Sequence, residues 1–360
     1  MNQHNYVVIM AGGVGSRFWP YSRTAKPKQF LDILNTGRSL IQMTFDRFRK
    51  LAPAENIYIV TNEDYAGLVA EQLPEIDQEQ ILTEPVRRNT APCVAYATYK
   101  IRQKDPSHEA CMIVAPSDHA IFNEDEFISR LELAMASARE DDRLVTMGIQ
   151  PTRPETGYGY IQYIPNDHDE VKQVKTFTEK PQLELAETFI QSGDFVWNAG
   201  IFIWSVPSIV SSFEKHMPDM AELFEEACDK FFTDAEQEAI KETYALCKSI
   251  SIDYGVMEHA ENVFTVLGDF GWTDLGSWAS LHEQSPRDEN ENAVSGNVLI
   301  YDTKNSLIRL PQDKLAIIQG LDGYLVTEED GILIICHKDQ DQQFRDFIAD
   351  VKSKKGEKYL

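Results

Sequence analysis

A glycine-rich loop followed by basic residues is the first part of this sequence that could carry out chemistry. Gly12, Gly13 and Gly15 come directly after a short apolar run, and residues without a side chain let backbone N–H groups approach a ligand closely. Arg17 and Lys28 follow in a stretch rich in cations. Because backbone donors and fixed cations together suit a polyphosphate, we predict that this loop binds a triphosphate.

The loop is neither of the two most familiar phosphate-binding loops. A P-loop requires G-x-x-x-x-G-K-[ST], and no lysine follows these glycines at that position. A dinucleotide fingerprint requires G-x-G-x-x-G, and Phe18 stands at the third glycine position, which disfavours a dehydrogenase. A tight strand-to-helix turn with a solvated basic flank stays open as a structural alternative. We expect Lys28 to lie at the surface of a cleft and to contribute little to folding.

One aspartate follows a buried strand directly. Ser117 and Asp118 come after the apolar run 111–115, within the segment P-S-D-H. A carboxylate at the carboxyl end of a strand is well placed to hold Mg²⁺, which prefers one or two carboxylates together with phosphate and water oxygens. The alternative is that Asp118 is a turn or helix-cap residue. Asp274, in the segment W-T-D-L-G-S-W, could by itself also be a cap.

A loop bounded by prolines is interpreted as a base pocket, mainly on the family resemblance given below. It contains Glu84 and Pro85, followed by Asn89 and Thr90, just before an apolar helix that we expect to start at Pro92. Asn89 or Thr90 should cap that helix. Glu84 could also meet the edge of a purine, and the residues alone do not decide between the two roles.

Three further segments could contact a sugar. Gly159, in T-G-Y-G-Y-I, would let the backbone approach a sugar ring, although a simple hairpin is the alternative. Glu179 could accept sugar hydroxyls and Lys180 could meet a sugar phosphate, although exposed pairs of this kind are more often solvated surface charges. Asn198 stands in an otherwise apolar strand, where a buried amide needs hydrogen-bond partners.

Strand-like and helix-like segments alternate along the first half of the chain. Apolar runs at 6–10, 57–61, 111–115 and 144–147 are separated by helical patterns at 40–50 and 127–138. This alternation predicts an α/β fold with helices on a Rossmann-like, mostly parallel sheet. The segments 158–164, 171–177 and 196–204 also read as sheet, and 206–247 reads as acidic helices.

A change in composition near residue 285 predicts a second domain. After a polar, turn-rich stretch come short strands near 298–301, 306–309, 315–319, 324–327 and 332–336, and then a helix near 340–352 with one apolar side. We therefore expect a catalytic domain over 1–284 and a small β-rich domain over 285–360, with a left-handed β-helix as one option for it. Unpaired strand edges usually need a partner surface, so we expect this domain to form a homodimer. It contains no constellation of metal ligands or acid–base pairs in its sequence, so we expect it to do no chemistry.

Composition excludes several classes of partner. The formal charge of −24 argues against nucleic acid and anionic membranes, but residues 1–50 carry +6 and the remaining 310 carry −30. Such a local basic region suits a small anionic ligand. The five cysteines show no C-x-x-C spacing, so neither a zinc site nor a disulfide framework is expected. The lack of a signal peptide and of a membrane-length apolar run predicts a cytoplasmic enzyme.

The segment A-G-G-x-G-S-R-F-W-P-x-S with K-P-K-Q-F resembles the signature of sugar-nucleotide pyrophosphorylases, and more narrowly that of the mannose-1-phosphate guanylyltransferases. E-P-x3-N-T-A-P, T-G-Y-G-Y-I, E-K-P, W-N-A-G-I-F, S-I-D-Y-G-V-M-E and W-x-D-L-G-S-W follow in the order of that family. The resemblance covers roughly residues 6–280. The longer relatives carry a phosphomannose isomerase domain, which we expect this chain to lack.

The resemblance implies synthesis of GDP-mannose and pyrophosphate from GTP and α-D-mannose 1-phosphate. It implies that Arg17 and Lys28 hold the triphosphate, that Lys180 holds the incoming phosphate, and that Asp118 and Asp274 bind Mg²⁺. A different sugar 1-phosphate is one alternative. A non-catalytic sensor of sugar nucleotides is another, and it is disfavoured because the loop cations and both aspartates are present.

Overall fold

The computed structural model describes residues 2–13, 15–166, 168–340 and 343–360. Contacts within the chain divide it into two compact units. Unit 1 comprises Met1–Gly12, Gln42–Ser117 and Ile121–Trp272, and unit 2 comprises Gly13–Ile41, Asp118–Ala120 and Thr273–Leu360. The chain thus passes between the units several times. The predicted domain boundary near 285 stays a prediction.

The strands are β1 (Asn5–Met10), β2 (Ile57–Asn62), β3 (Ile81–Glu84), β4 (Cys111–Pro116), β5 (Ala120–Ile121), β6 (Leu144–Ile149), β7 (Gly159–Tyr163), β8 (Val171–Glu179), β9 (Phe195–Ser205), β10 (Val263–Leu267), β11 (Trp272–Thr273), β12 (Ala293–Ser295), β13 (Asn297–Tyr301), β14 (Leu307–Arg309), β15 (Leu315–Gln319), β16 (Tyr324–Glu329) and β17 (Ile332–His337). The α-helices are α1 (Leu40–Phe48), α2 (Ala66–Gln72), α3 (Thr90–Lys104), α4 (Glu124–Glu140), α5 (Leu183–Ser192), α6 (Val206–His216), α7 (Pro218–Ala227), α8 (Glu236–Leu246), α9 (Trp278–Gln284) and α10 (Gln343–Lys355).

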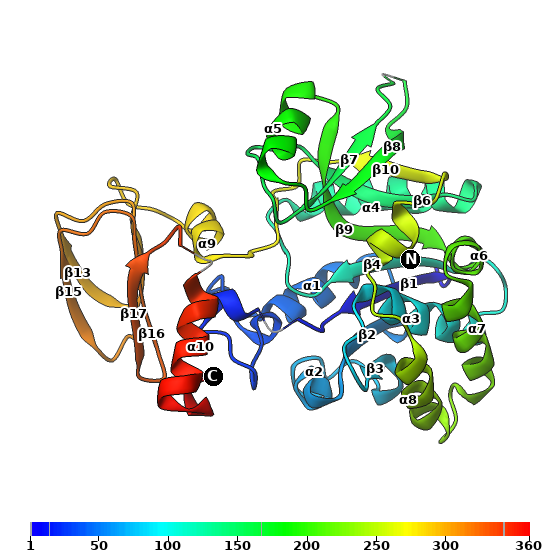
Figure 1. Ribbon diagram of the computed structural model, residues 1–360, viewed down its shortest axis with the longest axis horizontal. Coiled ribbons are helices and arrows are strands. Elements are labelled where there is room, and N and C mark those ends of the chain that lie inside the picture. Colours follow the sequence, from blue (N-terminus) through cyan, green and yellow to red (C-terminus); the bar gives the residue numbers. More distant parts are fainter. Residues whose placement is uncertain (1, 14, 167, 341–342) are drawn as a thin grey trace. The chain divides into compact units, whose positions relative to one another are not determined.

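Unit 1 is built on one large twisted sheet with the strand order β3-β2-β1-β4-β9-β6-β10-β8-β7 (Figure 1). β1 pairs in parallel with β2 and β4, whereas β8 and β9 run against the other strands. Val7, Val8 and Ile9 are fully buried, as expected of a strand that helices cover on both faces. The α/β fold with a mostly parallel sheet, which the alternating pattern predicted, is confirmed.

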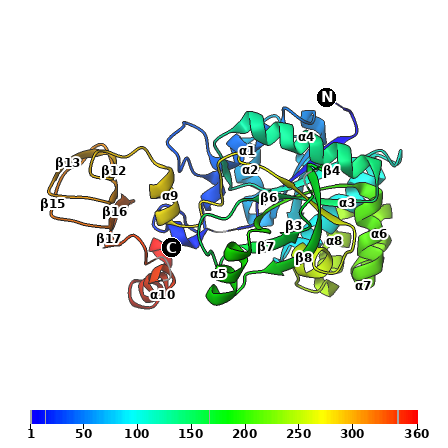
Figure 2. The same ribbon diagram turned by 90° about the horizontal axis from the view of Figure 1, so that it is seen from above.

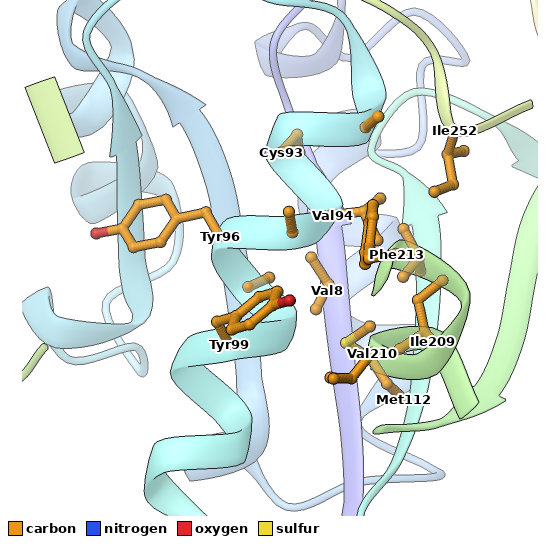
Figure 3. Close-up of a cluster of buried hydrophobic side chains, with 14 of the residues drawn as sticks. Val8, Cys93, Val94, Tyr96, Tyr99, Met112, Ile209, Val210, Phe213 and Ile252 are labelled. Carbon is orange, nitrogen blue, oxygen red and sulfur yellow. The ribbon is translucent and has the colours of Figure 1, made fainter. Parts of the chain in front are cut away.

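Helices cover both faces of this sheet. Figure 2 shows α1 and α4 on one side, where Phe48 and Phe127 pack edge to face with ring centroids 6.2 Å apart, and α6 and α7 on the other. On that second side, side chains of α3 and α6, among them Val94 and Phe213, surround Val8 of β1 in a tightly packed cluster (Figure 3). These two layers hold the carboxyl ends of the central strands in place.

Unit 2 is rich in β-structure and ends in a helix, as predicted. β12, β14 and β16 pair in parallel, β17 joins antiparallel to β16, and β13 and β15 form a second parallel pair. Whether these turns make a left-handed β-helix stays a prediction. In the described ranges, every helix of the protein is too short or too polar to span a bilayer.

The loop after β1 packs against this β-rich part within unit 2. Arg309 of β14 donates to the backbone carbonyls of Ile33 and Asp32 and lies 4.3 Å from the ring centre of Tyr21. Trp278 of α9 packs on Phe18 with ring centroids 5.0 Å apart. The C-terminal strands therefore help to position the glycine-rich loop.

Three predicted helix starts are wrong. α3 begins at Thr90 rather than Pro92, because Asn89 caps it by accepting from the backbone N–H of Thr90. α5 begins at Leu183, two residues after Pro181, which was expected to start it. The last helix was predicted over 340–352 but runs from Gln343 to Lys355; residues 341–342 of that prediction lie outside the described residues.

Candidate active site

The glycine-rich loop leaves β1 in a conformation that only glycine adopts easily. Gly15 has φ = 66°, and a Cβ atom there would lie 2.4 Å from Cβ of Lys28. Its carbonyl accepts from the hydroxyl of Ser22 at 2.5 Å and from the backbone N–H of Phe18 at 3.0 Å. The missing side chain of Gly15 thus lets Lys28 pack against the loop. Val14 lies outside the described residues.

The ammonium group of Lys28 connects the loop to both predicted metal-binding aspartates. Its Nζ lies 2.9 Å from Oδ2 of Asp118, and it donates to the backbone carbonyls of Asp274 at 2.6 Å and Leu275 at 3.1 Å. All of these residues belong to unit 2. The expectation that Lys28 lies at a surface is wrong, because it is buried and bonded to three oxygens. Its effect on folding stays untested.

Asp118 is kept ionised by its neighbours. Burial alone would raise the pKa of its carboxyl, but the charges of Lys28 and His119 and the hydrogen bond from Lys28 hold the pKa below its usual range. Asp274 is fixed in a tight turn, where its Oδ1 accepts from the N–H of Gly276 at 2.8 Å. Lys28 thus pairs with the carboxylate of Asp118 and bonds the backbone of Asp274, so that both aspartates lie beside one cation.

The carboxylates fit a hard divalent cation whose remaining ligands come from elsewhere. Among the described residues, no three His, Cys, Asp or Glu side chains gather closely enough to ligate a metal by themselves. Mg²⁺ commonly takes one or two carboxylates and completes its shell with phosphate and water oxygens. The donor set of Asp118 and Asp274 suits such a site. Arg17 is exposed on η1 (Ser16–Phe18), where it can reach an anion from solvent.

The predicted base-pocket residues lie in unit 1. Glu84 ends β3 and is 6% exposed, and the hydroxyl of Tyr244 donates to its Oε1 at 3.0 Å. Its Oε2 would be 3.8 Å from a Cβ placed on Gly12, so it lies beside the start of the loop. Burial raises the pKa of Glu84 to about 7, although the bond from Tyr244 and the charge of Arg87 oppose the rise.

Two of these predicted residues already have protein partners. The Asn89 amide oxygen caps α3, and the hydroxyl of Thr90 accepts from the backbone N–H of Ile252 at 2.9 Å. Pro85 follows Glu84 where β3 ends. Ser117 is held by its backbone N–H, which donates to the carbonyl of Met10 at 3.0 Å. Tyr244 reaches one oxygen of Glu84, so the other is the oxygen of this side chain that a base could meet.

The predicted sugar-binding residues come together on three strands of unit 1. Gly159 of β7 pairs with Glu179 of β8, and a Cβ on Gly159 would lie 2.4 Å from Oε2 of Glu179. The same Cβ would lie 3.3 Å from Cβ of Asn198 in β9, so a side chain here would require both neighbours to shift. Lys180 donates to Oε1 of Glu179 at 2.6 Å.

Sequence reasoning missed one member of this cluster. Asp253 begins the π-helix η7 (Asp253–Met257), and its Oδ1 accepts from Nδ2 of Asn198 at 3.0 Å. Burial, and next the charge of Glu179, raise the pKa of Asp253 to about 7 against the opposing effects of Lys180 and Asn198. The motif S-I-D-Y-G-V-M-E was noticed in the sequence, but its spacing gives no sign that Asp253 lies beside Asn198.

Comparisons with known proteins identify the family of this chain. A family model described as "Nucleotidyl transferase" matches residues 6–291. The chain is 34% identical over 348 residues to a mannose-1-phosphate guanylyltransferase of Escherichia coli, which covers 95% of this chain and 74% of that protein. It is 37% identical over 336 residues to a mannose-1-phosphate guanylyltransferase of Salmonella montevideo, with 91% and 70% covered.

A solved structure shares the fold over nearly the whole chain. The crystal structure of a mannose-1-phosphate geranyltransferase from Thermus thermophilus has a TM-score of 0.84 and 31% sequence identity, and the match covers 97% of this chain and 100% of that chain. Every candidate site residue lies within the range that the family model matches.

Proposed function

Because this chain belongs to the nucleotidyl transferase family, we propose that it transfers the guanylyl group of GTP to α-D-mannose 1-phosphate. The products are GDP-mannose and pyrophosphate. The observation that carries the proposal is the position of Lys28, whose Nζ joins the glycine-rich loop to Asp118 and to the backbone of Asp274. Cations and carboxylates gathered in this way suit a nucleoside triphosphate and its metal ion.

The reaction needs no nucleophile from the protein. An oxygen of the sugar phosphate attacks the α-phosphorus of GTP, a new P–O bond forms, and the bond to the departing pyrophosphate breaks. Catalysis then consists of holding two anions in line and compensating their charge. We assign Arg17 and Lys28 to the triphosphate and Lys180 to the sugar phosphate. The backbone N–H groups of Gly12, Gly13 and Gly15 would add donors around the triphosphate.

Enzymes of this family generally use a divalent metal ion, and we propose that it is Mg²⁺ here. Asp118 and Asp274 would hold it, because Asp118 stays ionised beside Lys28 and both carboxylates belong to unit 2. When bound, such an ion supplies positive charge to phosphate oxygens. The contribution of the chain itself is to keep Asp118 deprotonated and fixed in place.

Base selection is assigned to Glu84. Guanine presents N–H donors on its Watson–Crick edge, which a carboxylate can accept, whereas uracil and thymine present fewer donors there. Tyr244 holds one oxygen of Glu84 and leaves the other for the base. Asn89, Thr90, Pro85 and the backbone at Ser117 would then shape the pocket, rather than all bonding to the base. Gly159, Glu179 and Asn198 are assigned to the sugar.

We also propose a homodimer formed by the β-rich part of unit 2. Leu299 of β13 lies opposite Ile317 of β15, and these residues are 48% and 66% exposed. Leu315 and Tyr301 on the same two strands are also more than half exposed, which makes an apolar patch that suits a second copy. A cytoplasmic location stays a prediction.

The proposed function is tested by incubating the purified chain with each nucleoside triphosphate and a panel of sugar 1-phosphates. Pyrophosphate release is measured, and the sugar nucleotide is identified by mass spectrometry. Geranyl diphosphate serves as a further donor, because the Thermus neighbour is described as a geranyltransferase. GTP with mannose 1-phosphate should give the highest kcat/KM. A higher value for any other pair would refute the assignment of donor or acceptor.

A further inference from the structure

We propose that Asp253 recognises the sugar directly, by accepting a hydrogen bond from one hydroxyl group of the sugar 1-phosphate beside Asn198 and Glu179. This inference rests on the proposed function, because it assigns a further specificity-determining residue to the same reaction. It comes from the way that hydrogen bonds are already distributed among the neighbouring side chains of unit 1.

Asn198 is a poor acceptor for a sugar hydroxyl. Its amide oxygen accepts from the backbone N–H of Gly200 at 3.1 Å and lies 2.9 Å from the hydroxyl of Thr146, whose single hydrogen can go either to this oxygen or to the carbonyl of Ile201 at 3.1 Å. The bond from Gly200 fixes which side of the amide carries the nitrogen, and Thr146 crowds the oxygen against a further ligand. One N–H of that nitrogen goes to Asp253, so Asn198 can offer a ligand only one donor.

Glu179 can meet only part of the need for acceptors. One of its oxygens accepts from Lys180, and the other lies directly over the backbone of Gly159. Its side chain is only 9% exposed. A pyranose has several hydroxyls, each of which donates one hydrogen, so a further acceptor is needed at this place. Asp253 is the carboxyl group that stands there.

The backbone donors on either side of Asp253 do not depend on its carboxyl group, which among the described backbone groups meets only the N–H of Asp253 itself. The backbone N–H of Ile252 donates to Thr90, and that of Tyr254 donates to the hydroxyl of Ser251 at 3.2 Å. The donors on both sides of Asp253 at the start of η7 are thus satisfied by other side chains. In the part of the chain that the structure describes, Asn198 gives Asp253 its one side-chain hydrogen bond.

Placing a second carboxyl beside Glu179 also has a cost. The two acids repel each other when both are ionised, and burial adds to that cost, as the pKa of Asp253 near 7 indicates. A backbone N–H, the charge of Lys180 and the bond from Asn198 offset only part of this cost. Costs of this kind are concentrated at functional sites, and a bound hydroxyl would supply the missing partner.

The test compares the effect of changing Asp253 with the effect of removing single hydroxyl groups from the substrate. Asp253→Asn preserves side-chain size and an oxygen that can accept from Asn198, but it removes the carboxylate. Wild type and variant are assayed with GTP and mannose 1-phosphate, and then with its 2-deoxy, 3-deoxy, 4-deoxy and 6-deoxy analogues. Asp234→Asn, an exposed aspartate elsewhere in unit 1, is the matched control.

We expect Asp253→Asn to lower kcat/KM for mannose 1-phosphate by about 10- to 100-fold, the usual effect of losing a hydrogen bond to a charged group. With one deoxy analogue the variant and the wild type should agree within about threefold, because the partner hydroxyl is already absent. KM for GTP should change by less than about twofold. Asp234→Asn should match the wild type throughout.

Two results would overturn the inference while leaving the proposed function intact. One is a variant as active as the wild type, and the other is an equal loss with all four deoxy analogues, which would mean that Asp253 only positions Asn198. If Asp253→Asn fails to fold, as judged by circular dichroism, Asp253→Ala is measured in the same comparison. A wild-type chain that releases no pyrophosphate with any sugar 1-phosphate would refute both proposals.

Discussion

Replacing Lys28 by methionine should damage activity and stability together, through the same three bonds. Its ammonium group pairs with Asp118 and donates to the carbonyls of Asp274 and Leu275. Methionine fills similar space but leaves these oxygens without their donor. Breaking a buried ion pair from one side costs about 3–5 kcal/mol. Since the side chain of Asp118 is 31% exposed and water can reach it, we expect about 2–4 kcal/mol.

The loss of activity should be larger than the loss of folded protein explains. Removing one charge contact to the transition state typically lowers kcat/KM by about 10²- to 10³-fold. Urea unfolding gives the free energy of unfolding, and pyrophosphate release gives kcat/KM in buffer where the variant stays folded. Lys26→Met is the matched control, because Lys26 lies in the same loop but is exposed. It should change neither quantity appreciably.

A double variant separates the two effects of Lys28. In Lys28→Met with Asp118→Asn no unpaired carboxylate remains, so part of the lost stability should return while activity stays low. The low pKa of Asp118 depends on Lys28, and a carboxyl with a depressed pKa stabilises the fold above its unfolded pKa and loses that effect as pH falls. The stability gap between wild type and Lys28→Met should therefore narrow in acid. Near-wild-type turnover in Lys28→Met would refute the reasoning.

Four further outcomes are expected. GTP should be preferred over UTP and dTTP by at least about tenfold in kcat/KM, and comparable rates would defeat the assignment of Glu84 to guanine. The pKa of Glu84 rises from 4.5 to about 7 on folding, so protonation of Glu84 stabilises the fold at low pH. This contribution, about 3 kcal/mol in total, should be lost as the pH rises between these two values. Glu84→Gln should remove this pH dependence of the free energy of unfolding, as measured in urea. Asp118→Asn and Asp274→Asn should each abolish most activity and raise the Mg²⁺ concentration needed for half-maximal rate. The double variant should be scarcely less active than either single variant, and additive losses would mean that the two aspartates share no metal ion. Ile317→Asp should convert a dimer into a monomer in analytical ultracentrifugation without changing the far-ultraviolet circular dichroism, and an unchanged mass would reject the patch on β13 and β15.

The sequence predicts what local pattern controls. The apolar run before Gly12 becomes β1, and the helical pattern around Phe127 becomes α4, since burial on a covered sheet requires these periods. The fold class follows from their alternation. The starts of α3 and α5 were predicted from Pro92 and Pro181, but a side-chain cap at Asn89 sets the first one earlier.

The sequence does not predict which distant residues meet. Lys28 and Asp274 are 246 positions apart, and nothing in either motif shows that the lysine donates to the backbone of the aspartate. Asp253 and Asn198 are likewise joined only by the folded sheet and η7. The passage of the chain between the two units, with residues 13–41 grouped with the C-terminal part, also depends on contacts such as those of Arg309. Tertiary contacts of this kind carry no periodic signal.

Three candidate site acids have pKa shifts of different direction, and this difference matches what each is proposed to bind. In unit 2 the pKa of Asp118 is lowered beside Lys28, so its charge is fixed where phosphates and a cation must be balanced. In unit 1 burial raises the pKa of both Glu84 and Asp253 to about 7, and each accepts a hydrogen bond from a neutral group, Tyr244 or Asn198. A base edge and a sugar hydroxyl are neutral and donate hydrogen bonds, so a carboxyl that is costly to ionise without a ligand is stabilised by either ligand.

Ligand binding should then lower the pKa of Glu84 and of Asp253 but leave that of Asp118 less changed. Carboxyl ¹³C chemical shifts, followed against pH with and without GDP-mannose, would measure this. Equal shifts at all three acids would show that the division between charge balance in unit 2 and recognition of neutral groups in unit 1 is wrong.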